Sequence, residues 1–154
     1  MNTIYKIHAP GDGASGKRRI LVVNTGGTIG MVNTAAGYAP HREAFHRLLM
    51  QMPELQSDAM PLWDIVDMVP LLDSSNMTVL EWNAIGEVIS LHYGEYDGFV
   101  VLHGTDTMAY TASALSFTLR NNAKPVILTG SQIPLCEIRN DDREIGRASC
   151  RERV

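Results

Sequence analysis

The chain reads Arg-Ile-Leu-Val-Val-Asn-Thr-Gly-Gly-Thr over residues 19–28, and this stretch decides the fold class. A short, continuous apolar run that ends in a tight turn is typical of a strand buried on both faces of a parallel sheet. Comparable runs occupy residues 65–72, 98–103 and 125–129, and each ends on small or polar residues rather than on a hairpin signal. We therefore expect a parallel strand in each of these places.

Helical patterns fill the intervals between the runs, at residues 41–52, 78–93 and 107–120. In the second pattern, apolar residues recur at steps of three and four, and Thr78 with Glu81 predicts a capping box at its start. Strands that alternate with helices imply right-handed crossover connections. The sequence thus predicts an α/β fold, a three-layer Rossmann-like domain with a mainly parallel sheet.

Polar segments follow three of the expected strands, at residues 25–28, 73–76 and 103–107. In an open parallel sheet, ligands bind outside the carboxyl ends of the strands. We therefore expect these three loops, which are distant in sequence, to meet in one crevice.

The overall composition argues against two classes of partner. A formal net charge of -4 and a pI near 5.7 provide no positive field for nucleic acid or anionic lipid. No apolar run approaches the roughly 20 residues of a membrane span. Residues 1–18 lack the apolar core of a signal peptide and are rich in glycine and small polar residues. We expect them to be a flexible leader, and the protein to be cytoplasmic.

Neither the cysteines nor the histidines are spaced like metal ligands. Cys136 and Cys150 are too few for a disulfide framework, and we take both thiols to be non-functional. His41, His46 and His92 lie on helical patterns without the spacing of metal ligands. We expect no metal site.

The composition changes abruptly after residue 144, where arginine becomes frequent and periodicity is lost. With one allowed codon per residue, residues 145–154 back-translate to ATC GGA AGA GCG TCG TGT AGG GAA AGA GTG, which resembles a common sequencing-library adapter. A solvated tail and a basic nucleic-acid arm are the other interpretations. We expect an adapter artefact at 145–154, and an incomplete domain at 19–144.

The first motif is Thr-Gly-Gly-Thr-Ile-Gly at residues 25–30. Paired glycines after a buried strand allow the backbone to approach a ligand and to aim N–H groups at it. A tight turn, a phosphate-binding loop and a hydroxyl nucleophile at Thr28 are all compatible with this pattern. The spacing matches neither standard nucleotide fingerprint.

The second motif is His-Gly-Thr-Asp-Thr-Met at residues 103–108, where a strand gives way to a helix. Asp106 could simply cap backbone N–H groups. A carboxylate beside the Thr105 hydroxyl could also hold the α-ammonium group of an amino-acid substrate. The motif alone leaves both interpretations open.

Taken together, the two motifs resemble the threonine signatures of the bacterial-type L-asparaginase family, at residues 22–30 and 98–108 and in the same order. The resemblance continues through residues 37–38, 73–78 and 130–134, so that it covers 19–144. Asp73-Ser74-Ser75 is similar to the cytoplasmic, type I branch, whereas the secreted branch usually has Gly-Ser-Gln there.

The resemblance implies that Thr28 is the nucleophile, helped by Tyr38 on a mobile loop after the first strand. Thr105 would be the second catalytic hydroxyl, paired with Asp106 and with a lysine that lies beyond residue 144. A threonine hydroxyl needs such a relay because it is almost wholly protonated at neutral pH. Lys124 precedes a strand, on the edge opposite the crevice, and we do not assign it this role.

The resemblance also implies that Asp73 and Ser74, with Thr105 and Asp106, bind the α-amino and α-carboxylate groups of L-asparagine. The reaction would be cofactor-free hydrolysis to L-aspartate and ammonia, by a homo-oligomer, dimer or tetramer, whose full-length chain adds a carboxyl-terminal domain that is absent here. We expect this fragment to be inactive alone. Alternatives are the asparaginase-like subunit of a tRNA-dependent amidotransferase, a non-catalytic amino-acid-binding domain and a nucleotide-binding module.

Overall fold

A computed structural model describes residues 4–5 and 16–137, and its centre is a five-stranded sheet of order β1-β5-β2-β6-β7. Four of these strands are parallel: β2 (Arg19–Asn24), β5 (Leu62–Asp67), β6 (Gly98–Leu102) and β7 (Val126–Thr129). The expected parallel sheet is therefore confirmed. The segment at 145–154, expected to be an artefact, lies outside the described residues.

Two strands differ from the expectation. The run at 65–72 gives a strand that begins three residues earlier, at Leu62, and ends at Asp67. The Met68 N–H still bonds to the Asn24 carbonyl at 2.9 Å, but Pro70 has no N–H with which to extend the ladder. A further strand, β1 (Ile4–Tyr5), pairs antiparallel with β5 from within the segment expected to be a flexible leader.

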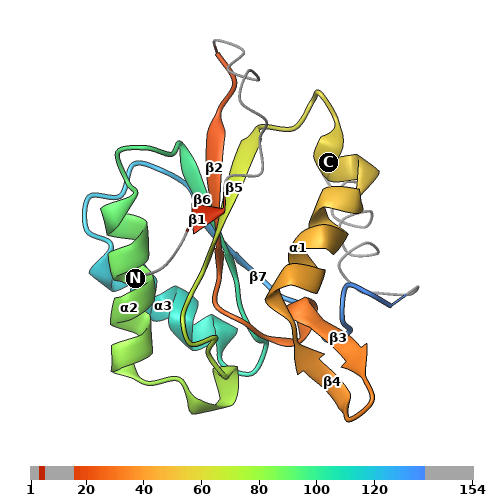
Figure 1. Ribbon diagram of the computed structural model, residues 1–154. Helices are drawn as coiled ribbons and strands as arrows, with labels where there is room; N and C mark the ends of the chain where they lie inside the picture. Colours follow the sequence, from red (N-terminus) through yellow and green to blue (C-terminus); the bar gives the residue numbers. More distant parts are fainter. Residues whose placement is uncertain (1–3, 6–15, 138–154) are drawn as a thin grey trace, which may run out of the picture.

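The helices lie on both faces of the sheet, with α2 and α3 on one side and α1 on the other (Figure 1). Their bounds are α1 (Arg42–Gln51), α2 (Val79–Leu91) and α3 (Met108–Thr118). Thr78 is the N-cap of α2 and forms the predicted capping box with Glu81, whose carboxylate accepts from the Thr78 N–H at 2.7 Å. The three-layer arrangement is thus present, as the alternating pattern predicted.

Two apolar cores hold the layers together, because successive strand residues point to opposite faces of the sheet. Leu21 and Val23 face α2 and α3, where they meet Ile85 and Ile89. The other core lies beneath α1 and includes Phe45, Leu49, Trp63, Ile65 and Leu102. Burying a side chain of this size contributes about 2 kcal/mol, so both layers are firmly attached to the sheet.

The segment after β2 is more regular than the mobile loop that we expected there. A single 3-10 turn, η1 (Thr28–Gly30), leads into an antiparallel hairpin of β3 (Met31–Thr34) and β4 (Gly37–Pro40). Tyr38 lies in β4, opposite Asn33. The backbone hydrogen bonds of the ladder give this segment a defined conformation.

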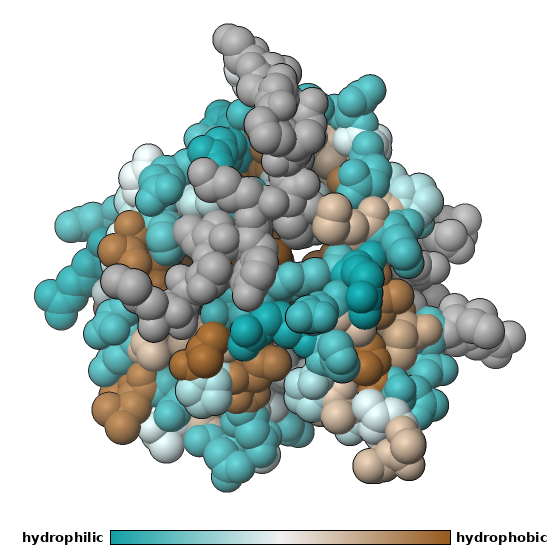
Figure 2. Space-filling view, viewed as in Figure 1, coloured by the Kyte–Doolittle hydropathy of each residue, from teal (hydrophilic) through white to brown (hydrophobic). Residues whose placement is uncertain are grey.

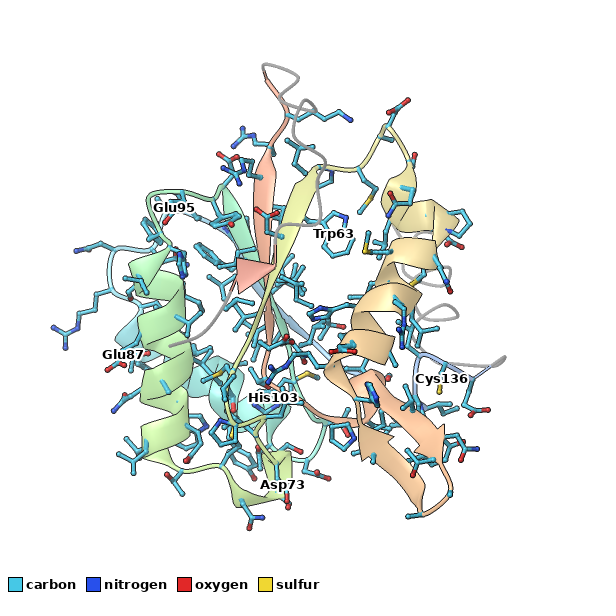
Figure 3. The ribbon with its side chains drawn as sticks, in the orientation of Figure 1. Trp63, Asp73, Glu87, Glu95, His103 and Cys136 are labelled. Carbon is cyan, nitrogen blue, oxygen red and sulfur yellow. The ribbon has the colours of Figure 1, made fainter. Side chains whose placement is uncertain are left out.

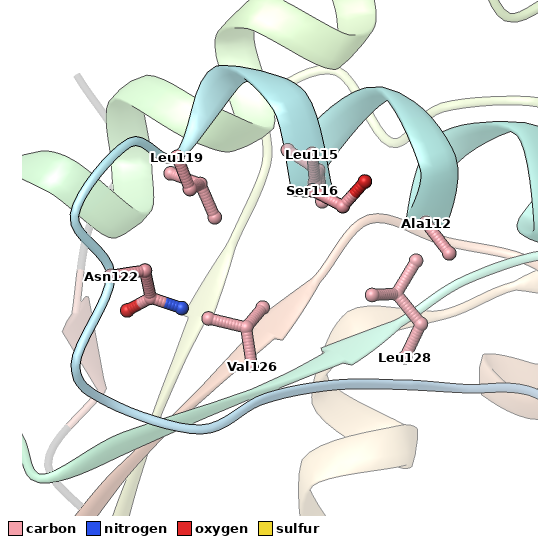
Figure 4. Close-up of a pocket in the computed structure, with 7 residues that line it drawn as sticks. All are labelled: Ala112, Leu115, Ser116, Leu119, Asn122, Val126 and Leu128. Carbon is pink, nitrogen blue, oxygen red and sulfur yellow. The ribbon is translucent and has the colours of Figure 1, made fainter.

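Two features of the surface lie away from the strand ends. A pocket of about 380 Å³ between α3 and β7 is lined by Ala112, Leu115, Ser116, Leu119, Asn122, Val126 and Leu128 (Figure 4). It offers one hydroxyl and one amide and no charge. On the face that Figure 2 shows, exposed apolar atoms are interspersed with hydrophilic ones. Within the described part of the chain, no helix is both long and apolar enough to cross a bilayer.

Candidate active site

The glycine turn after β2 is packed tightly against two other loops. Gly26 and Gly27 have φ values of 118° and 92°, which favour glycine. A Cβ on Gly27 would lie 2.7 Å from Gly104 Cα, and one on Gly26 would lie 2.6 Å from the Leu72 carbonyl oxygen. The loops after β2, β5 and β6 therefore meet, as their strand-end positions predicted.

One of the turn's N–H groups is used within the protein. The Gly26 N–H donates to Asn24 Oδ1 at 3.1 Å. The paired glycines predict N–H groups aimed at a ligand, and for Gly26 this prediction is wrong, because an amide oxygen of its own strand accepts the proton first. The glycine turn instead holds Thr28 at the rim of the crevice.

This crevice is a pocket of about 210 Å³ that brings together five of the six predicted site residues. They are Thr28, Asp73, Ser74, Thr105 and Asp106, and the backbone of Gly26, Gly27 and Gly104 completes the wall with Met31, Pro40, Leu71 and Leu72. Figure 3 shows Asp73 and His103 toward the carboxyl end of the strands, away from Glu95 at the other end of the sheet.

A direct bond joins two of these side chains. Ser74 Oγ donates to Asp106 Oδ2 at 2.7 Å, and Thr107 Oγ1 donates to the Ser74 carbonyl oxygen at 2.7 Å. Thr107 is also the N-cap of α3, without a side-chain cap bond. The loop after β6 is thus bonded twice to the loop after β5, and Asp106 does not cap α3 as the bland interpretation allowed.

Asp73 is held by its own 3-10 turn, η3 (Ser74–Asn76). Its Oδ1 accepts from the Ser75 N–H at 2.9 Å and from Ser75 Oγ at 2.8 Å, and its Oδ2 accepts from Asn76 Nδ2 at 2.8 Å. The Ser75 hydroxyl above all lowers the pKa of Asp73, because it stabilises the carboxylate. A carboxylate has about four acceptor positions, so Asp73 keeps capacity for a cationic ligand.

Tyr38 is the predicted site residue that the structure does not bring into the pocket. Its ring is half exposed on the hairpin, and its hydroxyl donates to Glu137 Oε1 at 2.7 Å. This hydrogen bond to Glu137 raises the pKa of Tyr38, because it stabilises the protonated phenol. In this arrangement Tyr38 is a poor proton acceptor.

Gln132 is a site neighbour that the sequence pattern did not single out. It follows β7, and its Nε2 donates to Thr105 Oγ1 at 2.7 Å. The signal was available, because residues 130–132 occupy the end of a parallel strand just as the other three loops do. The same rule would have added a fourth loop to the crevice.

His103 lies fully buried directly behind the pocket. Its Nδ1 is 2.6 Å from the Gly104 carbonyl oxygen and its Nε2 is 2.9 Å from Thr111 Oγ1, which accepts from Trp82 Nε1 at 3.0 Å. Burial lowers the pKa of His103, because it penalises the charged form. A neutral imidazole with the proton on Nδ1 satisfies all three contacts.

The pocket is acidic and contains no base for a hydroxyl nucleophile. Its described lining has two carboxylates and no lysine, arginine or histidine. Lys124 lies at the other end of the sheet, where its Nζ donates to the carbonyl oxygens of Tyr93 and Tyr96, at 2.7 Å for Tyr96. Among the described residues, no three histidine, cysteine or acidic side chains are grouped as metal ligands. The absence of a metal stays a prediction.

A comparison with known families gives one match across this region. The profile of the family described as "Asparaginase, N-terminal" matches residues 19–150. The chain belongs to the asparaginase family. L-asparaginase 1 of Escherichia coli K12 is 57% identical over 125 residues, which are 81% of this chain and 37% of that protein. The chain thus spans well under half the length of this asparaginase.

Solved asparaginase structures agree with the fold. L-asparaginase I from Vibrio cholerae superposes with a TM-score of 0.77 at 48% identity, covering 83% of this chain and 38% of that one. The thermostable L-asparaginase from Thermococcus kodakarensis gives a TM-score of 0.68 at 38% identity, covering 80% of this chain and 37% of that one. A more distant relative belongs to the glutamyl-tRNA(Gln) amidotransferase of Saccharolobus islandicus. It is 38% identical over 122 residues, which are 75% of this chain and 26% of that protein.

Proposed function

We propose that this chain supplies the amino-terminal part of an L-asparaginase, which hydrolyses L-asparagine to L-aspartate and ammonia. The observation that carries the proposal is the meeting of Thr28, Thr105 and Asp106 in one pocket, from loops far apart in sequence. Two hydroxyls beside a carboxylate provide a nucleophile and a group that recognises an amino acid.

Substrate binding is proposed to depend on the acidic side of the pocket. The carboxylates of Asp73 and Asp106 attract the α-ammonium group of the substrate, and the Ser74 hydroxyl can turn toward its α-carboxylate. Ser74 already orients Asp106 through their 2.7 Å bond. A zwitterionic amino acid therefore finds both of its charges matched.

The proposed reaction begins with attack of Thr28 Oγ1 on the side-chain amide carbon of asparagine. The hydroxyl proton passes through a relay that includes Thr105, and the amide nitrogen leaves as ammonia once it is protonated. Water then hydrolyses the acyl-threonine ester and restores the hydroxyl. Tyr38 assists only after it leaves Glu137, and the base is the lysine that we place beyond residue 144.

Further proposals concern the whole protein. We propose a cytoplasmic, cofactor-free homo-oligomer, dimer or tetramer, whose carboxyl-terminal part completes the relay. Because the described pocket contains no base, we propose that the chain is inactive alone.

The test compares the chain alone with a completed chimera, in which residues 1–144 are joined to the part of E. coli L-asparaginase 1 that follows the matched segment. We expect ammonia release from asparagine by the chimera and none by the chain. Turnover by the chain itself would overturn the inactivity proposal. A folded chimera that binds asparagine without turnover would instead indicate an amino-acid-binding domain, and a rise in melting temperature with ATP or NAD a nucleotide-binding module.

A further inference from the structure

A buried polar chain runs from α1 to the glycine turn behind Thr28. At its centre is Asp67, the last residue of β5, which is 1% exposed. Asp67 Oδ2 forms ion pairs with Arg42 Nε at 3.2 Å and with His46 Nε2 at 3.1 Å, both on α1. Asp67 Oδ1 accepts from Asn24 Nδ2 at 2.6 Å. One carboxylate therefore connects α1 to the end of β2.

The Asn24 amide is a two-sided link whose orientation is fixed by its neighbours. A carboxylate can only accept, so Asn24 must turn its NH₂ group toward Asp67. The amide oxygen then faces the other way and accepts from the Gly26 N–H at 3.1 Å. Asn24 is 2% exposed, so water does not compete for either bond. Removing the negative charge of Asp67 removes the reason for this orientation.

The consequence reaches the pocket within two residues. Gly26 is followed by Gly27, which packs against the backbone of Gly104, and then by Thr28 at the rim. The same carboxylate holds α1, which begins four residues after Tyr38 of the hairpin. The position of the Thr28 hydroxyl therefore depends on a group that touches neither the pocket nor a substrate.

We propose that Asp67 is a positioning residue, which orients the Asn24 amide and thereby fixes the loop that presents Thr28. The effect on the loop is independent of any reaction. Its effect on turnover rests on the proposed function, in which Thr28 is the nucleophile. A misplacement of about 1 Å in a reacting group can lower a rate by about 100-fold, so such a link is worth testing.

The chain offers a matched control on the same strand. Asp64 is also buried, at 3% exposure, and its Oδ2 accepts from Arg19 at 2.9 Å and from the Tyr96 hydroxyl at 2.8 Å. It lies toward the opposite end of β5 from the pocket. If a buried carboxylate on β5 matters only for general stability, Asp64→Asn and Asp67→Asn will have the same local effects.

The deciding experiment is hydrogen exchange, followed by mass spectrometry, on the chain as given. In Asp67→Asn we expect amides of residues 25–29 to exchange about tenfold faster than in the parent, the change expected for loss of one net hydrogen bond. In Asp64→Asn we expect exchange of this peptide to stay within about twofold of the parent. Equal exchange of residues 25–29 in the two variants would overturn the proposal.

Asn24→Ala supplies a second comparison, because it removes the acceptor of the Gly26 N–H directly. If Asp67 acts through Asn24, adding Asp67→Asn to Asn24→Ala gives no further increase in loop exchange, whereas full additivity contradicts the proposal. Arg42→Gln changes a residue whose side chain is 36% exposed and is used if Asp67→Asn does not fold. Loop exchange must then rise in Arg42→Gln as well.

Kinetics of the completed chimera add a readout that lowered stability alone would not move. We expect Asp67→Asn to reduce kcat about tenfold with KM within about twofold, and Asp64→Asn to change neither. A rise in KM at constant kcat would contradict a role in placing Thr28. An inactive chimera would count against the proposed function alone, because hydrogen exchange decides the positioning role by itself.

Discussion

Ser74 Oγ donates a 2.7 Å hydrogen bond to Asp106 Oδ2, although 32 residues separate the two side chains in sequence. The bond joins the loop after β5 to the loop after β6, and both side chains line the pocket with Thr28 and Thr105. Ser74 is 6% exposed, so this contact is shielded from solvent on one side. The recognition of an amino acid and the joining of two loops therefore depend on the same pair.

The first prediction concerns this pair in the completed chimera. We expect Asp106→Asn to raise KM for asparagine at least about tenfold, because an amide still accepts a hydrogen bond but no longer neutralises the α-ammonium group. Ser74→Ala should raise KM by a smaller factor, because Asp106 then loses its orienting donor. In the double variant the two effects should be less than additive.

Steady-state kinetics of the four proteins measure the coupling between the two residues. Ser116→Ala is the control for Ser74→Ala, since Ser116 is an exposed serine on α3 that lines the other pocket. Fully additive effects of Ser74→Ala and Asp106→Asn on KM would show that the bond does not position Asp106.

A second prediction concerns the two threonines. Thr28→Ala and Thr105→Ala should each lower kcat of the chimera by at least about 1000-fold, and the double variant should be little worse than either single one, because members of one catalytic unit fail together. Thr→Ser keeps the hydroxyl and should retain more activity than Thr→Ala at each position. Circular dichroism checks the fold. Turnover near the parent rate by well-folded Thr28→Ala would rule out Thr28 as the nucleophile.

The parts of this fold that could be predicted from sequence are those set by local patterns. Continuous apolar runs mark β2, β6 and β7, and the Thr78–Glu81 pair marks the start of α2, because strand burial and capping depend on neighbouring residues. The end of β5 was misplaced because the apolar run continues to Leu72 although the strand ends at Asp67. The pairing of Ile4–Tyr5 with β5 lies in a segment with no such pattern.

The candidate site was predictable to the same degree. The rule that parallel strands end at one edge places four separate loops together, and it located Thr28, Asp73 and Thr105 correctly in one pocket. The partners of these residues could not be read from the sequence. Asn24 with Asp67 is a buried polar contact between residues 43 apart, and no local periodicity signals such a contact.

The third prediction concerns the close approach of the glycine turn to Gly104. Gly27→Ala adds a Cβ that would lie 2.7 Å from Gly104, at a φ of 92°, so we expect it to lower the free energy of unfolding by more than about 3 kcal/mol. Gly37→Ala is the matched control, with a φ of 105° and no heavy atom within 4 Å of the added Cβ. It should lose only about 1 kcal/mol, through backbone strain alone.

Urea unfolding of both glycine variants, monitored by circular dichroism, makes this comparison on the chain as given. The difference between the two losses isolates the steric contact from the backbone strain, since both positions have positive φ. Equal destabilisation by the two substitutions would mean that the loops do not pack as closely as Gly27 and Gly104 indicate.

The last prediction is a pH dependence that arises from His103. Burial lowers the pKa of His103 in the folded protein, while the unfolded chain binds a proton near the ordinary value of about 6.5. The unfolded state therefore binds more protons as the pH falls below about 6.5. The stability is fully present above that pH and decreases below it, by at most about 1.4 kcal/mol per pH unit for one proton, until the folded protein is protonated too.

The test compares the parent with His103→Gln, which removes the titrating group, and with His92→Gln, which removes a histidine that pairs with Glu95 away from the pocket. Free energies of unfolding are measured in urea between about pH 5 and 8, at one salt concentration. We expect His103→Gln to be less stable at neutral pH, because the bonds to Thr111 and Gly104 are disturbed, and to lose less stability on acidification than the parent does. The His92→Gln protein should keep the parental loss. If the parent and His103→Gln lose equal free energy between about pH 6.5 and 5, the neutral, buried imidazole behind the pocket does not control the acid stability of this domain.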